Sequence, residues 1–258
     1  ETYGSPELIA SYIGSGMLDA QFDFNLYDAA VGAFSKTNGG VQRLAEVLES
    51  SLAGYGHHHL MGNISGNQDR ARFISYASGD LRLDEDAKLA GWSREIGKPK
   101  SVAYKKLALL HAFNFAVPGI PVIYYGDEYG MPGAGDPDNR RMMTFDGYDA
   151  DELALLSEVK ALVKLRNSNM ALLYGSTEIE VVNADVLIIH RQYFDENVWI
   201  IINNGEEEVS IDLDTFTKNG AKNLEEGPAG DLYMELPNKG SISLMIHENS
   251  FGTLISKN

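Results

Sequence analysis

The spacing of hydrophobic and polar residues changes near position 170. Before that position, short apolar runs that predict strands alternate with longer segments whose apolar residues recur every three or four positions, as on one face of a helix. We expect strands at 18–24, 58–64 and 121–125, and helices at 6–13, 25–51 with a break near residue 38, 103–117 and 151–166. This alternation predicts a parallel sheet with helices packed outside it.

After position 170, short apolar segments follow one another at intervals of roughly ten residues, with turn residues between them. We expect strands near 177–182, 186–193, 198–203, 208–213, 232–236 and 241–247. Asn203-Asn204-Gly205 is a turn signal between two of these segments. Residues 171–258 are therefore predicted to form an all-β antiparallel sandwich domain, joined to residues 1–170 by a hinge at 167–173.

The first region has the pattern of a barrel that lacks part of its length. The strand expected at 121–125 (PVIYY) is apolar on both faces, as strands of buried parallel sheets are. A complete (β/α)₈ TIM barrel takes roughly 250 residues, whereas residues 1–170 supply only the few clear strands named above. We therefore predict an α/β fold in which residues 1–170 form the C-terminal half of a (β/α)₈ barrel.

Composition and charge limit the classes of partner. Hydrophobic residues make up 44% of the chain, enough for a sizeable core, and no apolar run approaches the length of a membrane-spanning helix. The formal net charge of −16 argues against a nucleic-acid partner, whose phosphates would be repelled, but is compatible with a neutral sugar. Because the chain has no cysteine, disulfides and thiolate metal sites are excluded.

Candidate chemistry lies at the ends of the predicted strands, where barrels of this kind carry their active sites. Acidic residues at such positions are Glu1, Asp69, Asp127 and Glu128. Glycoside hydrolysis needs two carboxyl groups that face one sugar: one gives a proton to the leaving oxygen, and the other attacks or stabilises the cationic centre. Spacing alone does not choose among these acids, since each could equally be an exposed cap or a hydrogen-bonding loop residue.

Several motifs resemble the α-amylase family of glycoside hydrolases. Residues 119–131 (GIPVIYYGDEYGM) resemble the family's eighth strand and following loop, and residues 135–143 (GDPDNRRMM) are similar to the loop of its neopullulanase and cyclomaltodextrinase members. Residues 67–73 (NQDRARF) resemble the Asn-His-Asp motif after strand seven. Residues 1–4 (ETYG) and 16–24 (GMLDAQFDF) resemble the fifth-strand glutamate and the sixth strand. The resemblance implies that residues 1–170 hold barrel strands five to eight.

The resemblance also implies catalytic roles. Glu1 has the position of the general acid/base, and Asp69 that of the carboxylate that holds the substrate and stabilises the transition state. The implied activity is hydrolysis, or transfer, of α-glucosidic bonds in starch-like glucans or maltooligosaccharides with retention of configuration. The family's nucleophile ends strand four, upstream of Glu1. Without a nucleophile no glycosyl-enzyme can form, so we expect the isolated chain to be inactive.

The same resemblance suggests Tyr3, Gln68 and Arg72 as substrate-binding residues. Tyr3 matches an aromatic position that lines the cleft, although it could instead pack under its loop. Arg72 could contact sugar or form an ion pair that holds the loop. Gln68 replaces the family's histidine: both side chains can donate a hydrogen bond to a hydroxyl, but glutamine cannot become cationic. This departure leaves an alternative, a non-catalytic carbohydrate-binding or scaffold protein on the same fold.

We expect no metal site and no cofactor within the chain. The run His57-His58-His59 would alternate between the two faces of a strand, with no further ligand at a metal-binding spacing. The resemblance implies that Ca²⁺, where the family binds it, is held mainly by the missing first half. Independently of the resemblance, the carboxylates of Asp136 and Asp138 could chelate a hard cation, which is a minor alternative. Because half a barrel exposes apolar edges, we expect a complementary N-terminal half or self-association.

Overall fold

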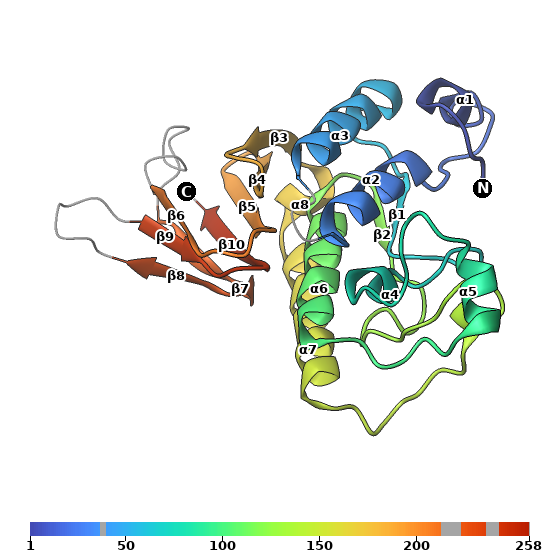
Figure 1. Cartoon of the computed structure of the whole chain (residues 1–258). Coiled ribbons are helices and arrows are strands. Elements are labelled where there is room, and N and C mark those ends of the chain that lie inside the picture. The colour runs from blue at the N-terminus through green and yellow to red at the C-terminus, as the bar shows by residue number, and fades with distance from the viewer. Residues whose placement is uncertain (37–39, 213–222, 236–242, 258) are drawn as a thin grey trace.

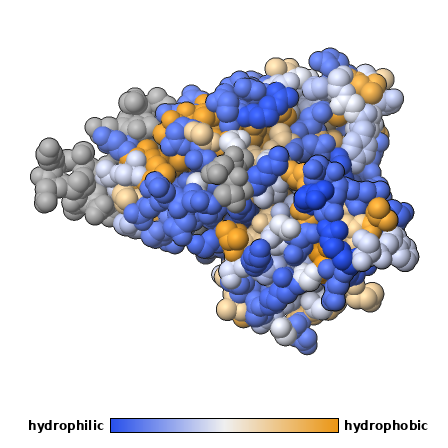
Figure 2. Space-filling view, in the orientation of Figure 1, coloured by the Kyte–Doolittle hydropathy of each residue, from blue (hydrophilic) through white to orange (hydrophobic). Residues whose placement is uncertain are grey.

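The computed structural model describes residues 1–36, 40–212, 223–235 and 243–257. Most helices gather on one side of the molecule, and the antiparallel strands of the C-terminal part lie on the other (Figure 1). Hydrophilic residues cover much of the face in Figure 2, and hydrophobic residues appear on it as separate small patches. The view of Figure 1 places the long helices α6 and α7 between the two groups of elements.

The parallel sheet is present but short. Strand β1 (Gly62–Ile64) pairs in parallel with β2 (Ile120–Val122), and Phe22 forms an isolated parallel bridge to Gly62. The strand expected at 18–24 is therefore wrong in extent, and so is the start of the strand expected at 58–64. One reason is that Asp23 ends its segment by capping the next helix, since its carboxylate accepts the Leu26 N–H at 3.0 Å.

Helices surround this sheet. Their bounds are α1 (Pro6–Ala10), α2 (Phe24–Phe34), α3 (Gln42–Tyr55), α4 (Phe73–Ala77), α5 (Ala87–Ser93), α6 (Ser101–Ala116), α7 (Ala150–Ser168) and α8 (Met170–Tyr174), with a 3₁₀ turn η1 (Asp138–Arg140). Helix α7 starts with a capping box in which Asp149 and Glu152 each accept the other's backbone N–H. The predicted helices are confirmed, with shifted ends.

The C-terminal part contains two antiparallel sheets. The larger has the order β3-β4-β5-β10-β7 and the smaller the order β6-β9-β8. Their strands are β3 (Ser176–Val181), β4 (Val186–Tyr193), β5 (Glu196–Asn203), β6 (Val209–Asp212), β7 (Glu225–Gly230), β8 (Leu232–Glu235), β9 (Ser243–Ile246) and β10 (Ser250–Lys257). One buried apolar cluster takes Ile188 and Trp199 from the larger sheet and Leu244 from the smaller. The antiparallel prediction is confirmed, but β7 and β10 were not predicted.

Two buried arginines donate to carbonyls at the end of α6, and one of them, Arg191 of β4, links the helical part to the C-terminal sheets. Arg166 donates to the carbonyls of Phe115 and Gly119, both at 2.6 Å, and Arg191 donates to the Ala116 carbonyl at 2.7 Å. Both guanidinium groups thus meet the carboxyl end of α6, where the helix dipole favours a cation. Burial lowers the pKa of Arg166 to about 10 and that of Arg191 to about 9. The predicted hinge at 167–173 is mostly helical, since α7 and α8 occupy it.

Candidate active site

The loops that follow β1 and β2 meet Glu1 at one end of the parallel sheet. Asn67, three residues after β1 and 4% exposed, connects the two candidate catalytic acids. Its amide nitrogen lies 3.4 Å from a Glu1 carboxylate oxygen, and its amide oxygen accepts the Asp69 N–H at 3.0 Å. The structure therefore brings Glu1 and Asp69 to the two sides of one buried amide.

Asp69 is held by polar groups but stays open to solvent. Its side chain is 55% exposed, and one guanidinium nitrogen of Arg140 lies 3.4 Å from its Oδ1. Gln68 donates to the other carboxylate oxygen at 3.2 Å. A carboxylate that is charge-paired from one side and open on another can accept hydrogen bonds from a sugar. Gln68 itself is exposed, so its amide could turn toward a ligand.

The turn η1 after β2 fixes the backbone beside Asp69. The Asn139 amide donates to the carbonyls of Gln68 and Arg70, both at 2.8 Å, and Arg140 Nε donates to the Gln68 carbonyl at 3.0 Å. Asn139 is completely buried. Sequence reasoning did not select Asn139. The only available signal was its place in the loop 135–143, because its partners lie about seventy positions away along the chain.

Of the two roles considered for Arg72, the structure shows the ion pair that holds the loop. Its side chain is 1% exposed and forms an ion pair of 2.9 Å with Asp127. The same guanidinium donates to the carbonyls of Tyr125 at 2.6 Å and Asn139 at 2.9 Å, and it lies 4.2 Å from the centre of the Tyr124 ring. Because these contacts bury the donor groups, the structure favours the loop-holding role of Arg72 over sugar contact.

The other two strand-end acids, Asp127 and Glu128, also accept hydrogen bonds from loop residues. Asp127 is 2% exposed and accepts the Ser65 hydroxyl at 2.6 Å in addition to Arg72. Glu128 accepts the Gly126 N–H at 2.6 Å. Both carboxylates thus accept hydrogen bonds that hold the loops after β1 and β2, whereas Glu1 and Asp69 are exposed.

Tyr3 lies against the start of α2. Its ring stacks on Phe24 with centroids 3.9 Å apart, and the Arg70 guanidinium lies 5.3 Å from its centre. Arg70 is in turn paired with Asp28 at 2.9 Å. Since Tyr3 remains 50% exposed, packing under the loop and contact with a ligand are both compatible with its position.

Possible metal ligands do not gather at this rim. Within the described ranges, no three His, Asp or Glu side chains lie close enough together to hold an ion. Asp136 faces Lys88 at 3.6 Å and Arg140 at 3.3 Å, and Asp138 is paired with Arg141 at 2.8 Å. No helix in the described part of the chain is both long and apolar enough to cross a membrane.

Comparison with known proteins gives a consistent set of relatives. Residues 1–212 match the family described as alpha amylase, catalytic domain. A cyclomaltodextrin glucanotransferase of Paenibacillus macerans is 30% identical over 203 residues, which cover 79% of this chain and 24% of that protein. A cyclomaltodextrinase of Thermoanaerobacter pseudethanolicus is 28% identical over 204 residues, which cover 78% of this chain and 31% of that protein.

Solved structures agree in fold. An Anoxybacillus α-amylase has a TM-score of 0.78 at 27% identity, with 98% of this chain and 50% of that chain covered. An α-amylase of Geobacillus thermoleovorans, solved with acarbose, has a TM-score of 0.76 at 26% identity, with 98% and 51% covered. The chain therefore spans about half the length of these structures and less than a third of the two curated relatives.

Proposed function

The chain belongs to the α-amylase family, and from that premise we propose that it supplies part of a retaining glycoside hydrolase that acts on α-glucosidic bonds of starch-like glucans or maltooligosaccharides. The observation that carries the proposal is the pair of contacts made by Asn67, 3.4 Å to the Glu1 carboxylate and 3.0 Å to the Asp69 backbone nitrogen. Two acids at the same end of a parallel sheet can face a common sugar.

In the proposed reaction, Glu1 gives its proton to the glycosidic oxygen while a nucleophilic carboxylate from an upstream strand attacks the anomeric carbon. The leaving sugar departs as an alcohol, and a covalent glycosyl-enzyme remains. Glu1 then takes a proton from water as the water oxygen displaces the nucleophile, which restores the original anomeric configuration. Asp69, oriented by Arg140 and Gln68, would hold the sugar hydroxyls and favour the oxocarbenium-like transition state.

The inner face of the sheet supports the proposal that a further segment completes the fold. Leu18, Leu60 and Ile120 are 55%, 53% and 49% exposed, and a cavity of about 270 Å³ runs between them to Glu1. Exposed apolar groups in such a row favour a covering element. We propose that upstream barrel strands cover this face, and that the 258 residues alone self-associate and release no sugar.

The family also suggests how the chain divides into two domains. Residues 1–170 would form barrel strands five to eight with their helices, and residues 171–258 a β-sandwich domain. The sandwich is supported by the cluster that Val186 and Ile201 of the larger sheet form with Ile211 and Ile246 of the smaller.

Substitution of each acid in the polypeptide that carries this chain tests the proposal. Glu1→Gln and Asp69→Asn should each lower kcat on maltodextrin about 10²- to 10⁴-fold, because the proton donor or the transition-state carboxylate is lost. Glu46→Gln and Asp84→Asn are matched controls, since both acids are exposed and each is paired with a neighbouring arginine. Unchanged turnover in Asp69→Asn would show that the barrel rim takes no part in the reaction.

A second candidate function rests on Gln68. Its amide donates to the Asp69 carboxylate at 3.2 Å and cannot supply the positive charge of an imidazolium. The alternative is therefore a protein that binds carbohydrate without hydrolysing it. Maltodextrin binding without sugar release by the complete polypeptide, unchanged in Glu1→Gln, would favour this alternative over the hydrolase.

A further inference from the structure

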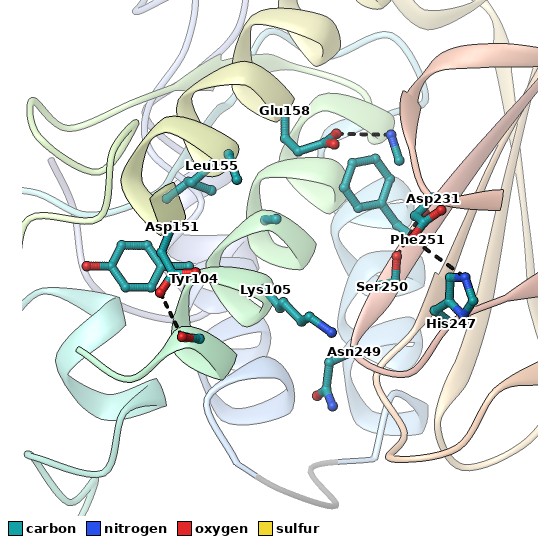
Figure 3. Close-up of a pocket in the computed structure, with 14 residues that line it drawn as sticks. Tyr104, Lys105, Asp151, Leu155, Glu158, Asp231, His247, Asn249, Ser250 and Phe251 are labelled. Carbon is teal, nitrogen blue, oxygen red and sulfur yellow. Dashed lines mark hydrogen bonds and ion pairs between the residues drawn. The ribbon is translucent and has the colours of Figure 1, made fainter. Parts of the chain in front are cut away.

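The larger antiparallel sheet ends in β7 on one side and in β3 on the other. Helix α7 lies against β7, and its Glu158, which Figure 3 shows pointing toward the C-terminal sheets, accepts the Gly230 N–H of this strand at 3.0 Å. Among the strands that the structure describes, β3 pairs only with β4. An uncovered edge strand is a place where a further strand can pair.

Every second residue of β3 directs its backbone groups to this free edge. In an antiparallel pair, alternate residues exchange hydrogen bonds with the partner strand, and the residues between them point their N–H and C=O groups the other way. Val182 donates to the Val186 carbonyl at 3.0 Å, and the register repeats this pairing at each even-numbered residue back to 176. The residues that point away from β4 are therefore Thr177, Ile179 and Val181. In the part of the chain that the structure describes, their backbone groups form no hydrogen bond on that side.

A cavity of about 230 Å³ opens beside the same edge, between α3 and β3. Its lining combines residues from the end of α3 and the following turn with two residues of the strand: Glu49, Leu52, Ala53, His57, Thr177 and Ile179. The hydroxyl oxygen of Thr177 is buried, and none of the described residues hydrogen-bonds to it. Since buried hydroxyls normally have a partner, an unused polar side chain and unused backbone groups lie together at this edge.

Charge decides which kind of strand fits the edge. Ile179 and Val181 pack against the larger buried apolar cluster, whereas Glu178 and Glu180 are exposed on the opposite face of β3. A second copy of β3 paired antiparallel about Ile179 would set Glu178 of one copy opposite Glu180 of the other. Like charges directly opposite each other are destabilising, while opposite charges stabilise the pair. The edge, like the chain with its net charge of −16, therefore favours a basic partner over a second copy.

We propose that the free edge of β3 binds an extended basic segment of a partner protein, which adds a strand to the larger sheet. The backbone of the segment would pair with Thr177, Ile179 and Val181, and its lysine or arginine side chains would face Glu178 and Glu180. The side chains between them would lie on the side of the cavity next to Ile179. In such strand addition, main-chain hydrogen bonds provide affinity and alternate side chains provide specificity. The proposal involves none of the residues assigned to catalysis.

Fluorescence anisotropy of a labelled hexapeptide in which lysine and valine alternate tests the edge, with the polypeptide that carries this chain as the binding protein. We expect a dissociation constant of about 0.1 mM, the affinity of a short strand without deep pockets. The matched peptide carries N-methyl groups on its valines, which keeps the charges but removes the N–H groups that would pair with β3. It should bind about tenfold more weakly or less, because several hydrogen bonds are lost together.

Charge reversal in the protein tests the same edge from the other side. Glu180→Lys should weaken binding of the lysine peptide about fivefold and strengthen binding of a glutamate–valine peptide, because it reverses a cross-strand charge pair. Asp84→Lys is the matched control: Asp84 is exposed just before α5, which Figure 1 shows on the side of the helical part away from β3. This control should change the affinity less than about twofold, since salt screens charges at such a distance.

The outcomes that overturn the proposal are distinct. They are equal binding of the N-methylated and unmethylated peptides, equal affinities of Glu180→Lys and Asp84→Lys, and absence of binding at roughly 2 mM peptide. A dimer that excludes the peptide would assign the edge to a second copy and would also overturn it. Slower exchange of the Thr177, Ile179 and Val181 amide hydrogens in the complex would support strand addition, because only these amides of β3 face the bound segment.

Discussion

Arg72 and Asp127 form an ion pair of 2.9 Å whose side chains are only 1% and 2% exposed. Taking both charges out of water is costly, and such a pair persists only where further hydrogen bonds satisfy its remaining groups. Here Ser65 donates to the carboxylate at 2.6 Å, and the carbonyls of Tyr125 and Asn139 accept from the guanidinium. The pair thereby ties the loop after β1 to the loop after β2, the two loops that frame Asp69.

Removing one partner should destabilise the protein strongly. Arg72→Met would leave the Asp127 carboxylate buried without its counterion, so we expect the free energy of unfolding to fall by about 3–5 kcal/mol. Denaturant titration measures this loss. Arg82→Met is the control, because Arg82 pairs with Asp84 at side-chain exposures of 72% and 79% and an exposed pair contributes at most about 1 kcal/mol. Equal losses in the two variants would contradict a structural role for the buried pair.

Asn67 should act as a positioning residue for the two acids. Asn67→Ala removes the contact to Glu1 and the acceptor for the Asp69 N–H, so we expect kcat to fall about tenfold or more, with a smaller change in KM. An unchanged kcat with lower stability would indicate a purely structural residue.

Asp23 illustrates a strand-end acid that stabilises rather than catalyses. Its carboxylate caps α2 through Leu26 N–H and accepts the Ser51 hydroxyl of α3 at 2.6 Å, and burial raises its pKa. Asp23→Ala should therefore lower stability by about 1–2 kcal/mol at neutral pH. Asp23→Asn keeps an acceptor for Leu26 and should lose less. Thermal unfolding of both variants checks the order, and a greater loss in Asp23→Asn would refute it.

The order of elements could be predicted because helix periodicity is a local property of the sequence. The site could be predicted in part: the strand-end rule selects Glu1 and Asp69, but it selects Asp127 equally well. What separates them is the position of Arg72, which lies 55 residues before Asp127, and no spacing rule encodes a contact at that distance.

The missed strands have a similar physical explanation. Strand β7 (EEGPAG) has almost no apolar side chains and forms because its backbone pairs with β10, with Gly230 opposite Gly252. In helix α7, Leu153 is 52% exposed while Leu155 and Val159 are buried. The periodicity of α7 allowed more than one face, and packing against α6 and β7 selected one.

Low pH should destabilise the protein through His59. Its Nδ1 accepts the Met61 N–H at 3.2 Å, which requires an unprotonated nitrogen, and burial together with the nearby Arg191 lowers its pKa to about 4. An unfolded chain would bind the proton at a pKa of about 6.5. Since the unfolded state then binds more protons between pH 6.5 and 4, the stability contributed at neutral pH is lost as pH falls through that window.

Substitution separates this effect from general acid denaturation. We expect His59→Gln, which keeps an acceptor for Met61, to flatten the fall in unfolding free energy between pH 6.5 and 4, with at most about 3 kcal/mol recovered at the acid end. His58→Gln is the matched control, because His58 is exposed in the preceding turn. Denaturant titrations at several pH values provide the measurement. Parallel pH profiles for His59→Gln and His58→Gln would show that protonation of His59 is not the source of the acid sensitivity.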